Sequence, residues 1–162
     1  YPLMNEHNNL KIEKIDEDSF NTIKDLRDDI KDESQFFERI IKIKEKTDEC
    51  YAVMFEDKAI AEVTVTLKSA DATVAKEGLR IYISGLYVKK AYRNRNIATY
   101  LISYIVDTFT NYGYKEITVL VDRTNTAAVN LYKKKGFINE RTYKEDDWIF
   151  DLLILKMKNT TK

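Results

Sequence analysis

Residues 86–99 read LYVKKAYRNRNIAT, and this stretch decides the fold because it joins an expected strand to the most regular helix of the chain. The strand is expected over 79–88 and the helix over about 97–112. Apolar side chains three and four positions apart give that helix one buried face, made of Ala98, Leu101, Ile102, Ile105 and Phe109. The N–H groups of a first helical turn lack partners and carry partial positive charge, so such a junction favours an anion.

The loop residues are suited to the same purpose. Asn94 and Asn96 tolerate the left-handed backbone that a tight loop before a helix needs. Arg93 and Arg95 supply charged donors that match phosphate oxygens. An ordinary solvated loop explains the same residues, and on the residues alone the two interpretations stay equally open.

The other expected elements follow from hydrophobic periodicity and turn residues. In order they are a strand over 10–15, helices over 17–30 and 33–47, strands over 51–55 and 59–67, a strand over 117–121, a helix over 126–135, and strands over 137–143 and 148–157. The second helix has a candidate half-buried face of Phe36, Phe37, Ile40, Ile41 and Ile43. The last strand is apolar on both faces, which predicts a central position. The pattern indicates one mixed α/β domain.

Length and composition limit the class of protein. A chain of 162 residues with 44% hydrophobic residues suits a single domain, which we expect over 10–158, with 1–9 as a disordered tail or expression remnant and 159–162 as a second tail. Lys and Arg number 27, as do Asp and Glu, and this balance disfavours a nucleic-acid partner. No apolar run approaches the roughly 20 residues that span a bilayer, so no membrane association is expected.

Two rare residue types limit the chemistry. Cys50 is the single cysteine, which is typical of a reducing compartment and predicts a cytoplasmic protein without a cysteine-based metal site. His7 is the single histidine and lies in a polar N-terminal stretch. Histidine-dependent triads and multi-histidine zinc sites are therefore excluded, and proton transfer is left to Tyr, Asp, Glu, water or the backbone.

Two motifs in the chain resemble the GNAT-type N-acetyltransferase family. Arg93 and Ala98 match its acetyl-CoA signature, Arg/Gln-x-x-Gly-x-Gly/Ala, at a strand–helix junction, while Asn96 replaces the middle glycine. Downstream, residues 125–137 resemble the family block Asn-x-x-Ala-x-x-Leu-Tyr-x-x-x-Gly-Phe. Two motifs in the right order on the expected elements are more specific than either one alone.

The resemblance implies a fold. The family has a central, mostly antiparallel sheet of six to seven strands, splayed between strands four and five and flanked by about four helices. Gly85 matches the position where the family places a bulge in strand four. The N-terminal helical region is the least similar part, because such families vary there with the acceptor.

The resemblance also implies a function, which is transfer of an acetyl group from acetyl-CoA to a primary amine by direct attack, without a metal. The residues expected to bind the cofactor are Leu86, Tyr87, Val88, Arg93, Asn94, Arg95, Asn96, Ile97, Ala98, Thr99 and Asn125. The Val88 N–H is the expected oxyanion donor. Tyr132 is the expected acid for the departing thiolate, although its position also fits simple core packing.

The base and the acceptor are less defined. Glu62 is the candidate base, possessing a carboxylate on the strand beside strand four, but a solvent-facing strand residue explains it equally well. The acceptor is a small-molecule or peptide amine, and a homodimer stays open. A non-catalytic module that binds acyl-CoA for sensing is the alternative function, since Asn96 departs from the signature and strand four carries no carboxylate.

Overall fold

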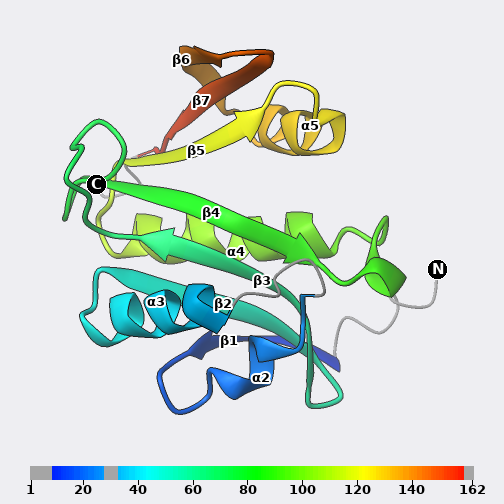
Figure 1. Ribbon diagram of the computed structural model, residues 1–162. Helices are drawn as coiled ribbons and strands as arrows, with labels where there is room; N and C mark the ends of the chain where they lie inside the picture. Colours follow the sequence, from blue (N-terminus) through cyan, green and yellow to red (C-terminus); the bar gives the residue numbers. More distant parts are fainter. Residues whose placement is uncertain (1–8, 28–32, 159–162) are drawn as a thin grey trace.

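Seven strands form one mixed sheet in the computed structural model, which describes residues 9–27 and 33–158 (Figure 1). The strands are β1 (Leu10–Ile15), β2 (Asp48–Phe55), β3 (Lys58–Thr66), β4 (Arg80–Val88), β5 (Glu116–Asp122), β6 (Ile138–Glu145) and β7 (Trp148–Lys156). Their order in the sheet is β1-β2-β3-β4-β5-β7-β6. Only β4 and β5 pair in parallel among these strands, so the predicted mostly antiparallel sheet is confirmed.

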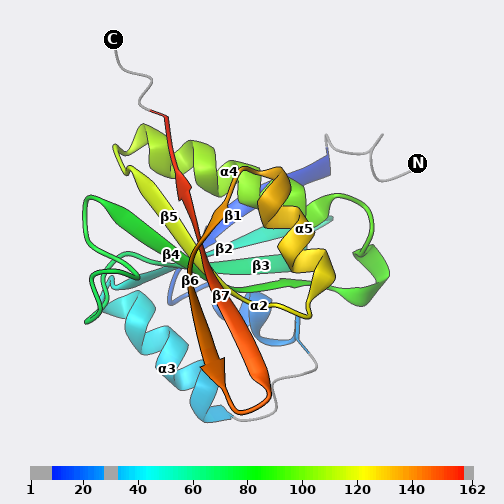
Figure 2. The same ribbon diagram turned by 90° about the horizontal axis from the view of Figure 1, so that it is seen from above.

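Helices cover both faces of the sheet. They are α2 (Asn21–Lys24), α3 (Glu33–Lys44), α4 (Ile97–Asn111) and α5 (Thr126–Lys134). Figure 2 shows α3 and α4 on opposite sides of the strands. Side chains of α4 and α5 pack into the larger core with β3, β4 and β5, and those of α2 and α3 pack into a smaller core against β2. The predicted count of about four helices is confirmed for the described residues.

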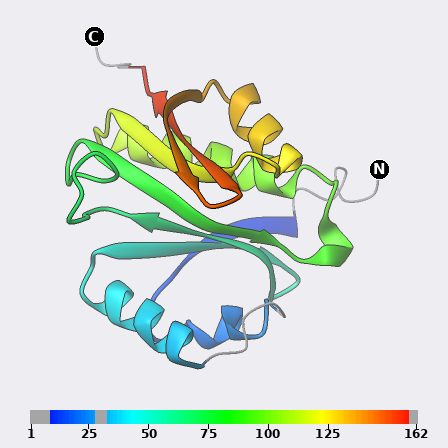
Figure 3. The ribbon, with the colours of Figure 1, turned by 45° about the horizontal axis from the view of Figure 1, so that its top comes forward.

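The central strands β4 and β5 separate along their length, as the sequence predicted. Their pairing runs from Arg80 opposite Glu116 to Ile83 opposite Val119 and then ends. Figures 1 and 3 show the two arrows starting side by side and diverging toward their tips. Gly85 lies two residues beyond Ile83, with a φ of 64°, a left-handed backbone that side chains disfavour. Beyond this glycine, β4 continues with its ladder to β3 alone.

The first predicted helix, over 17–30, is wrong in extent. The structure has only the four-residue α2, and residues 28–30 lie outside the described part of the chain. Asp16 and Ser19 bond each other's backbone N–H groups at 2.9 Å, and this local turn competes with a regular helix. Ile23 and Leu26 then bond carbonyls three residues back, the pattern of a tighter 3₁₀ turn.

The second predicted helix, over 33–47, is shorter than expected. It ends at Lys44, and Lys46 has a φ of 65°, which turns the chain into β2 three residues earlier than predicted. Its buried face is also narrower, because Phe36 is buried whereas Phe37 and Ile41 are exposed. The apolar side chains of this helix spread over more of its circumference than the sheet can cover, so some of them face outward.

The C-terminal strands deviate in two details. The last strand, β7, lies between β5 and β6, so it is internal to the sheet but not central. Leu120 in β5 is exposed, although the residues around it form a continuous apolar run. Residues 1–8 and 159–162, predicted as most of the first tail and the whole of the second, lie outside the described residues.

Candidate active site

A cavity of about 450 Å³ opens where β4 leaves β5, and we call it the helix-side cavity. The end of β4, the loop after it and the first turns of α4 and α5 form its walls. Its lining residues are Leu86, Tyr87, Val88, Tyr92, Arg93, Asn94, Asn96, Ile97, Ala98, Thr99, Asn125, Ala127, Ala128 and Leu131. The residues of β4 beyond Ile83 have no described partner in β5, so their backbone can pair with an extended ligand.

The loop before α4 has the geometry of an anion site. Asn94 and Asn96 have φ of 64° and 63°, which confirms the predicted left-handed backbone. The first intrahelical bond runs from the Tyr100 N–H to the Asn96 carbonyl, 3.0 Å, which leaves the N–H groups of residues 97–99 without acceptors in the helix. Arg93 Nε donates to the Val88 carbonyl at 2.8 Å and closes the loop onto β4.

The opposite wall is the start of α5. Asn125 Oδ1 accepts a hydrogen bond of 3.2 Å from the Ala128 N–H and so caps this helix. Ala127 and Ala128 line the cavity with methyl groups only. Sequence reasoning missed these two residues, together with Tyr92 and Leu131. The alanines occupy the first turn of a predicted helix that faces a strand separation, and their small size was the available signal.

Ten of the eleven residues predicted to bind the cofactor line this one cavity. They are Leu86, Tyr87, Val88, Arg93, Asn94, Asn96, Ile97, Ala98, Thr99 and Asn125. Arg95 is the exception, since it does not contribute to the lining. The sequence motif therefore brings together residues from β4, the loop, α4 and α5 at a single site.

The predicted acid, Tyr132, is a core residue of α5 and is not among the residues that line this cavity, although Ala128 and Leu131 of the same helix are. The Tyr132 side chain is 2% exposed, and its ring packs edge-on against Phe137 with centroids 5.2 Å apart. Burial, and then the nearby Tyr82, raise the pKa of Tyr132 well above its usual value. The phenol therefore keeps its proton throughout the neutral range, although the raised pKa makes it a weaker acid than an ordinary tyrosine.

The candidate base, Glu62, is buried, so the alternative of a solvent-facing strand residue is wrong. Its side chain is fully enclosed under α3, in the middle of β3. Arg39 Nη2 donates to Glu62 Oε1 at 2.5 Å, and the Cys50 thiol lies 3.6 Å from the same oxygen. The carboxylate lines neither this cavity nor the second one described below. Strand alternation places Glu62 on the face of β3 that was expected to be exposed to solvent, but α3 covers that face.

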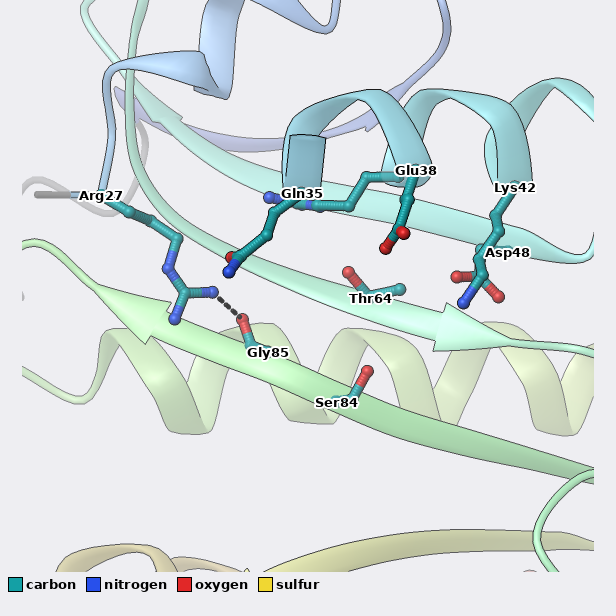
Figure 4. Close-up of a pocket in the computed structure, with 9 residues that line it drawn as sticks. Arg27, Gln35, Glu38, Lys42, Asp48, Thr64, Ser84 and Gly85 are labelled. Atoms are coloured by element: carbon teal, nitrogen blue, oxygen red, sulfur yellow. Dashed lines mark hydrogen bonds between the residues drawn. The ribbon is translucent and has the colours of Figure 1, made fainter. Parts of the chain in front are cut away.

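A second cavity, of about 300 Å³, lies between α3 and the sheet, and we call it the α3-side cavity (Figure 4). Its lining residues are Arg27, Gln35, Glu38, Arg39, Lys42, Asp48, Thr64, Ser84 and Gly85. In Figure 4 the side chains of α3 extend toward the strands, and Thr64 and Ser84 extend toward the helix. Because Ser84 and Gly85 precede Leu86 in β4, the two cavities are lined by consecutive residues of this strand.

Two other kinds of site receive no support in the described part of the chain. Residues 9–27 and 33–158 contain no group of three or more His, Cys, Asp or Glu side chains placed to hold a metal ion. Within the same residues, no helix has both the length and the apolar character needed to cross a bilayer.

Comparison with known proteins identifies the family. Residues 11–137 match the acetyltransferase (GNAT) family. The N-alpha-acetyltransferase MAK3 of Arabidopsis thaliana is 29% identical over 92 residues, a match that covers 57% of this chain and 46% of that protein, so the chain spans less than half of that relative's length.

Solved structures show the same fold. An N-acetyltransferase from Staphylococcus aureus Mu50 superimposes with a TM-score of 0.73 at 17% identity, over 93% of this chain and 99% of that one. NAA60 of Arabidopsis thaliana, in complex with acetyl-CoA, superimposes with a TM-score of 0.70 at 21% identity, over 91% and 98%. The family match covers most of the chain, including the β4–α4 junction and α5, and the chain therefore belongs to the GNAT family of acetyltransferases.

Proposed function

We propose that this protein transfers an acetyl group from acetyl-CoA to an amine, which attacks the thioester directly. The observation that carries the proposal is the helix-side cavity, where an unpaired strand edge and an anion-binding helix start face one space. Family membership and the acetyl-CoA complex of the similar NAA60 support it. The lack of a histidine among residues 9–27 and 33–158 agrees with a reaction that needs no activated nucleophile on the enzyme.

The two ends of acetyl-CoA suit two parts of the cavity. The pyrophosphate would accept hydrogen bonds from the N–H groups of residues 97–99, with Arg93 and the helix dipole adding positive charge. The pantetheine arm would pair with the backbone of Leu86 to Val88 like a short added strand. The thioester would then lie near the Val88 N–H, which would stabilise the oxyanion. Ala127 and Ala128 leave room for the arm on the far wall.

Tyr132 would protonate the leaving thiolate. It belongs to α5, the helix whose Ala127, Ala128 and Leu131 line the helix-side cavity, and burial keeps it protonated. Glu62 is a less suitable base, since one of its oxygens already accepts a short bond from Arg39 and no part of it reaches either cavity. We infer that the amine loses its proton without direct contact with Glu62.

An acceptor with an α-amino group fits this site better than a lysine side chain. With a pKa of about 7.7–8.0, an α-amine needs only about 1 kcal/mol for deprotonation at pH 7, compared with about 4–5 kcal/mol for a lysine amine. A weak base therefore suffices for the former. The similar MAK3 protein is named as an N-alpha-acetyltransferase, which supports a peptide N-terminus as the acceptor class. The amine would enter through the α3-side cavity and meet the thioester at Gly85 and Leu86.

Two further predictions accompany this function. A cytoplasmic location is supported by the single thiol, Cys50, which is buried and unpaired with another cysteine. A homodimer and the absence of nucleic-acid or membrane partners stay predictions of the sequence.

Binding of acetyl-CoA separates this proposal from an unrelated use of the cavity. At 100 times its dissociation constant a ligand adds about 2.7 kcal/mol of stability, which for a domain of this size corresponds to a rise in Tm of about 5–10 °C. We expect that rise with acetyl-CoA. An unchanged Tm at millimolar acetyl-CoA would exclude both the enzyme and the alternative of a non-catalytic acyl-CoA-binding module.

A further inference from the structure

Glu62 is the centre of a buried cluster of charges under α3. Besides the 2.5 Å bond to Oε1, Arg39 reaches Oε2 at 3.5 Å, and Arg27 Nη1 lies 3.9 Å from the same oxygen. The carboxylate is fully buried and the two arginine side chains are 16% and 20% exposed. Because desolvation offsets the attraction within such clusters, stability alone does not account for one at this position.

Arg27 connects this cluster to the irregular part of β4. In the β3–β4 ladder, Glu62 lies opposite Tyr87, and Thr64 lies opposite Ser84. Gly85 and Leu86 of β4 therefore face the single β3 residue between Glu62 and Thr64, which makes them a β-bulge. A bulge leaves backbone groups outside the ladder, and the Gly85 carbonyl accepts a hydrogen bond of 3.3 Å from Arg27 Nη1 (Figure 4). The Arg27 guanidinium thus holds the bulge from the side of α3.

The same guanidinium also holds Tyr87. The Arg27 Cζ atom lies 4.8 Å from the centre of the Tyr87 ring, and the Arg93 Cζ atom lies 5.3 Å from that centre. Tyr87 therefore contacts one arginine that lines the α3-side cavity and one that lines the helix-side cavity. Cation–π contacts of this kind fix the orientation of a ring.

We infer that Arg27, anchored by the Glu62–Arg39 pair, is a positioning residue that sets the Gly85 bulge and so presents the Leu86–Val88 backbone to acetyl-CoA. This inference rests on the proposed function and assigns Glu62 a different role from that of a base. Glu62 holds a guanidinium in place and touches neither the cofactor nor the amine. The donor strand for the pantetheine arm and the oxyanion N–H then depend on a charge cluster on the opposite side of β4.

The first test removes the Arg27 contacts and leaves the Glu62–Arg39 pair. Arg27→Met is expected to lower kcat/KM for acetyl-CoA about tenfold, the factor that corresponds to one charge-assisted hydrogen bond, and to weaken acetyl-CoA binding in calorimetry. Arg27→Lys keeps the charge beside Glu62 and is expected to recover part of the loss. Lys24→Met removes a partly exposed cation of α2, which lies 3.8 Å from the Glu33 carboxylate, and serves as the matched control, with wild-type kinetics.

The second test separates positioning from base catalysis. If Glu62 acts through Arg27, Glu62→Gln raises the KM for acetyl-CoA, keeps the shape of the pH–rate profile, and adds little to the effect of Arg27→Met in the double variant. The opposite result would assign Glu62 as the base and overturn the inference. In that case Glu62→Gln would remove an ionisation from the pH profile of kcat/KM for the amine, and the losses caused by Glu62→Gln and Arg27→Met would multiply in the double variant.

The outcomes for the two proposals are distinct. If the wild-type protein neither binds acetyl-CoA nor acetylates any amine, the proposed function fails. If the wild type is active and Arg27→Met matches Lys24→Met in kinetics and acetyl-CoA affinity, only the positioning role fails. Circular dichroism and Tm of each variant verify the fold, and Arg27→Lys, the mildest change, keeps the test valid if the other variants unfold.

Discussion

At the scale of single residues, burial decides which chemistry each group can perform. Tyr132 and Glu62 were both predicted to transfer protons, and the structure encloses both of them. Burial raises the pKa of Tyr132, which keeps the phenol protonated but makes it a weaker acid. Burial does not suit a base that must exchange protons with a substrate, and Glu62 is engaged by Arg39.

Replacing Tyr132 tests its role as the acid. Tyr132→Phe keeps the ring against Phe137, so we expect the Tm to change by less than about 4 °C. Turnover should fall about 10²-fold, as is usual when a general acid is lost. The measurement is steady-state release of CoA at saturating substrates. Tyr112→Phe, at an exposed tyrosine after α4, is the matched control, and equal rates for both variants would leave Tyr132 as a packing residue.

The thiol of Cys50 should be inert in the native protein. Burial, and then the neighbouring Glu62 carboxylate, raise the pKa of Cys50 to about 12, so the thiolate is absent below about pH 10. We expect a disulfide reagent to label this thiol only after denaturation. Rapid labelling of the native protein at pH 8 would mean that the region between β2 and α3 is open to solvent.

At the scale of elements, the start of α4 performs the central task of the site. Its first turn combines the unpaired N–H groups, the left-handed Asn96 and the closing bond of Arg93 to Val88. The unpaired N–H groups and the left-handed Asn96 follow from local sequence and were predicted for that reason, whereas the bond from Arg93 to Val88 was not predicted. The shape of the opposite wall depends on how α5 packs after the strand separation, which local sequence does not specify.

A negative charge at the start of α4 should separate helix stability from cofactor binding. Ala98→Asp places a carboxylate beside the partial positive charge of the first turn, which favours the helix. The same carboxylate repels the pyrophosphate, so the KM for acetyl-CoA should rise at least about tenfold. Asn111→Asp, at the last residue of α4, changes the charge equally and should leave this KM unaltered. A KM that is unchanged in Ala98→Asp would place the pyrophosphate elsewhere.

The β5–β7–β6 sheet should show an acid-dependent stability. Asp151 of β7 accepts hydrogen bonds from Arg123, at 2.8 and 2.9 Å, and from Thr142 of β6, and these bonds lower its pKa to about 2. The folded pKa lies below the usual value of 3.8, so this stabilisation is complete above about pH 4 and is lost as the pH falls toward 2. Asp151→Asn should lower the Tm by about 2–4 °C at pH 7 and by much less at pH 2. An equal difference at both pH values would contradict this role of the carboxylate.

At the scale of the whole molecule, the sequence predicted the fold better than the environment of single side chains. The order of elements, the strand separation and most of the lining of the helix-side cavity follow from periodicity and from motifs around Arg93 and Asn125. The short α2 was not predictable, because the Asp16–Ser19 turn competes with a helix of ordinary propensity. The cluster around Glu62 was equally hidden, since Arg27 and Arg39 are distant from it in sequence and read as exposed helix residues.

The most direct test of the account is release of the CoA thiol from acetyl-CoA in the presence of a panel of amines, followed between pH 6 and 10. We predict amine-dependent release, with peptide α-amines as the best acceptors and a rate that levels off near pH 8, where the α-amine is deprotonated. Faster release with lysine amines than with peptide α-amines, at a rate that keeps rising to pH 10, would contradict the acceptor class. Binding of acetyl-CoA without release for any amine would contradict the central claim that this cavity transfers the acetyl group.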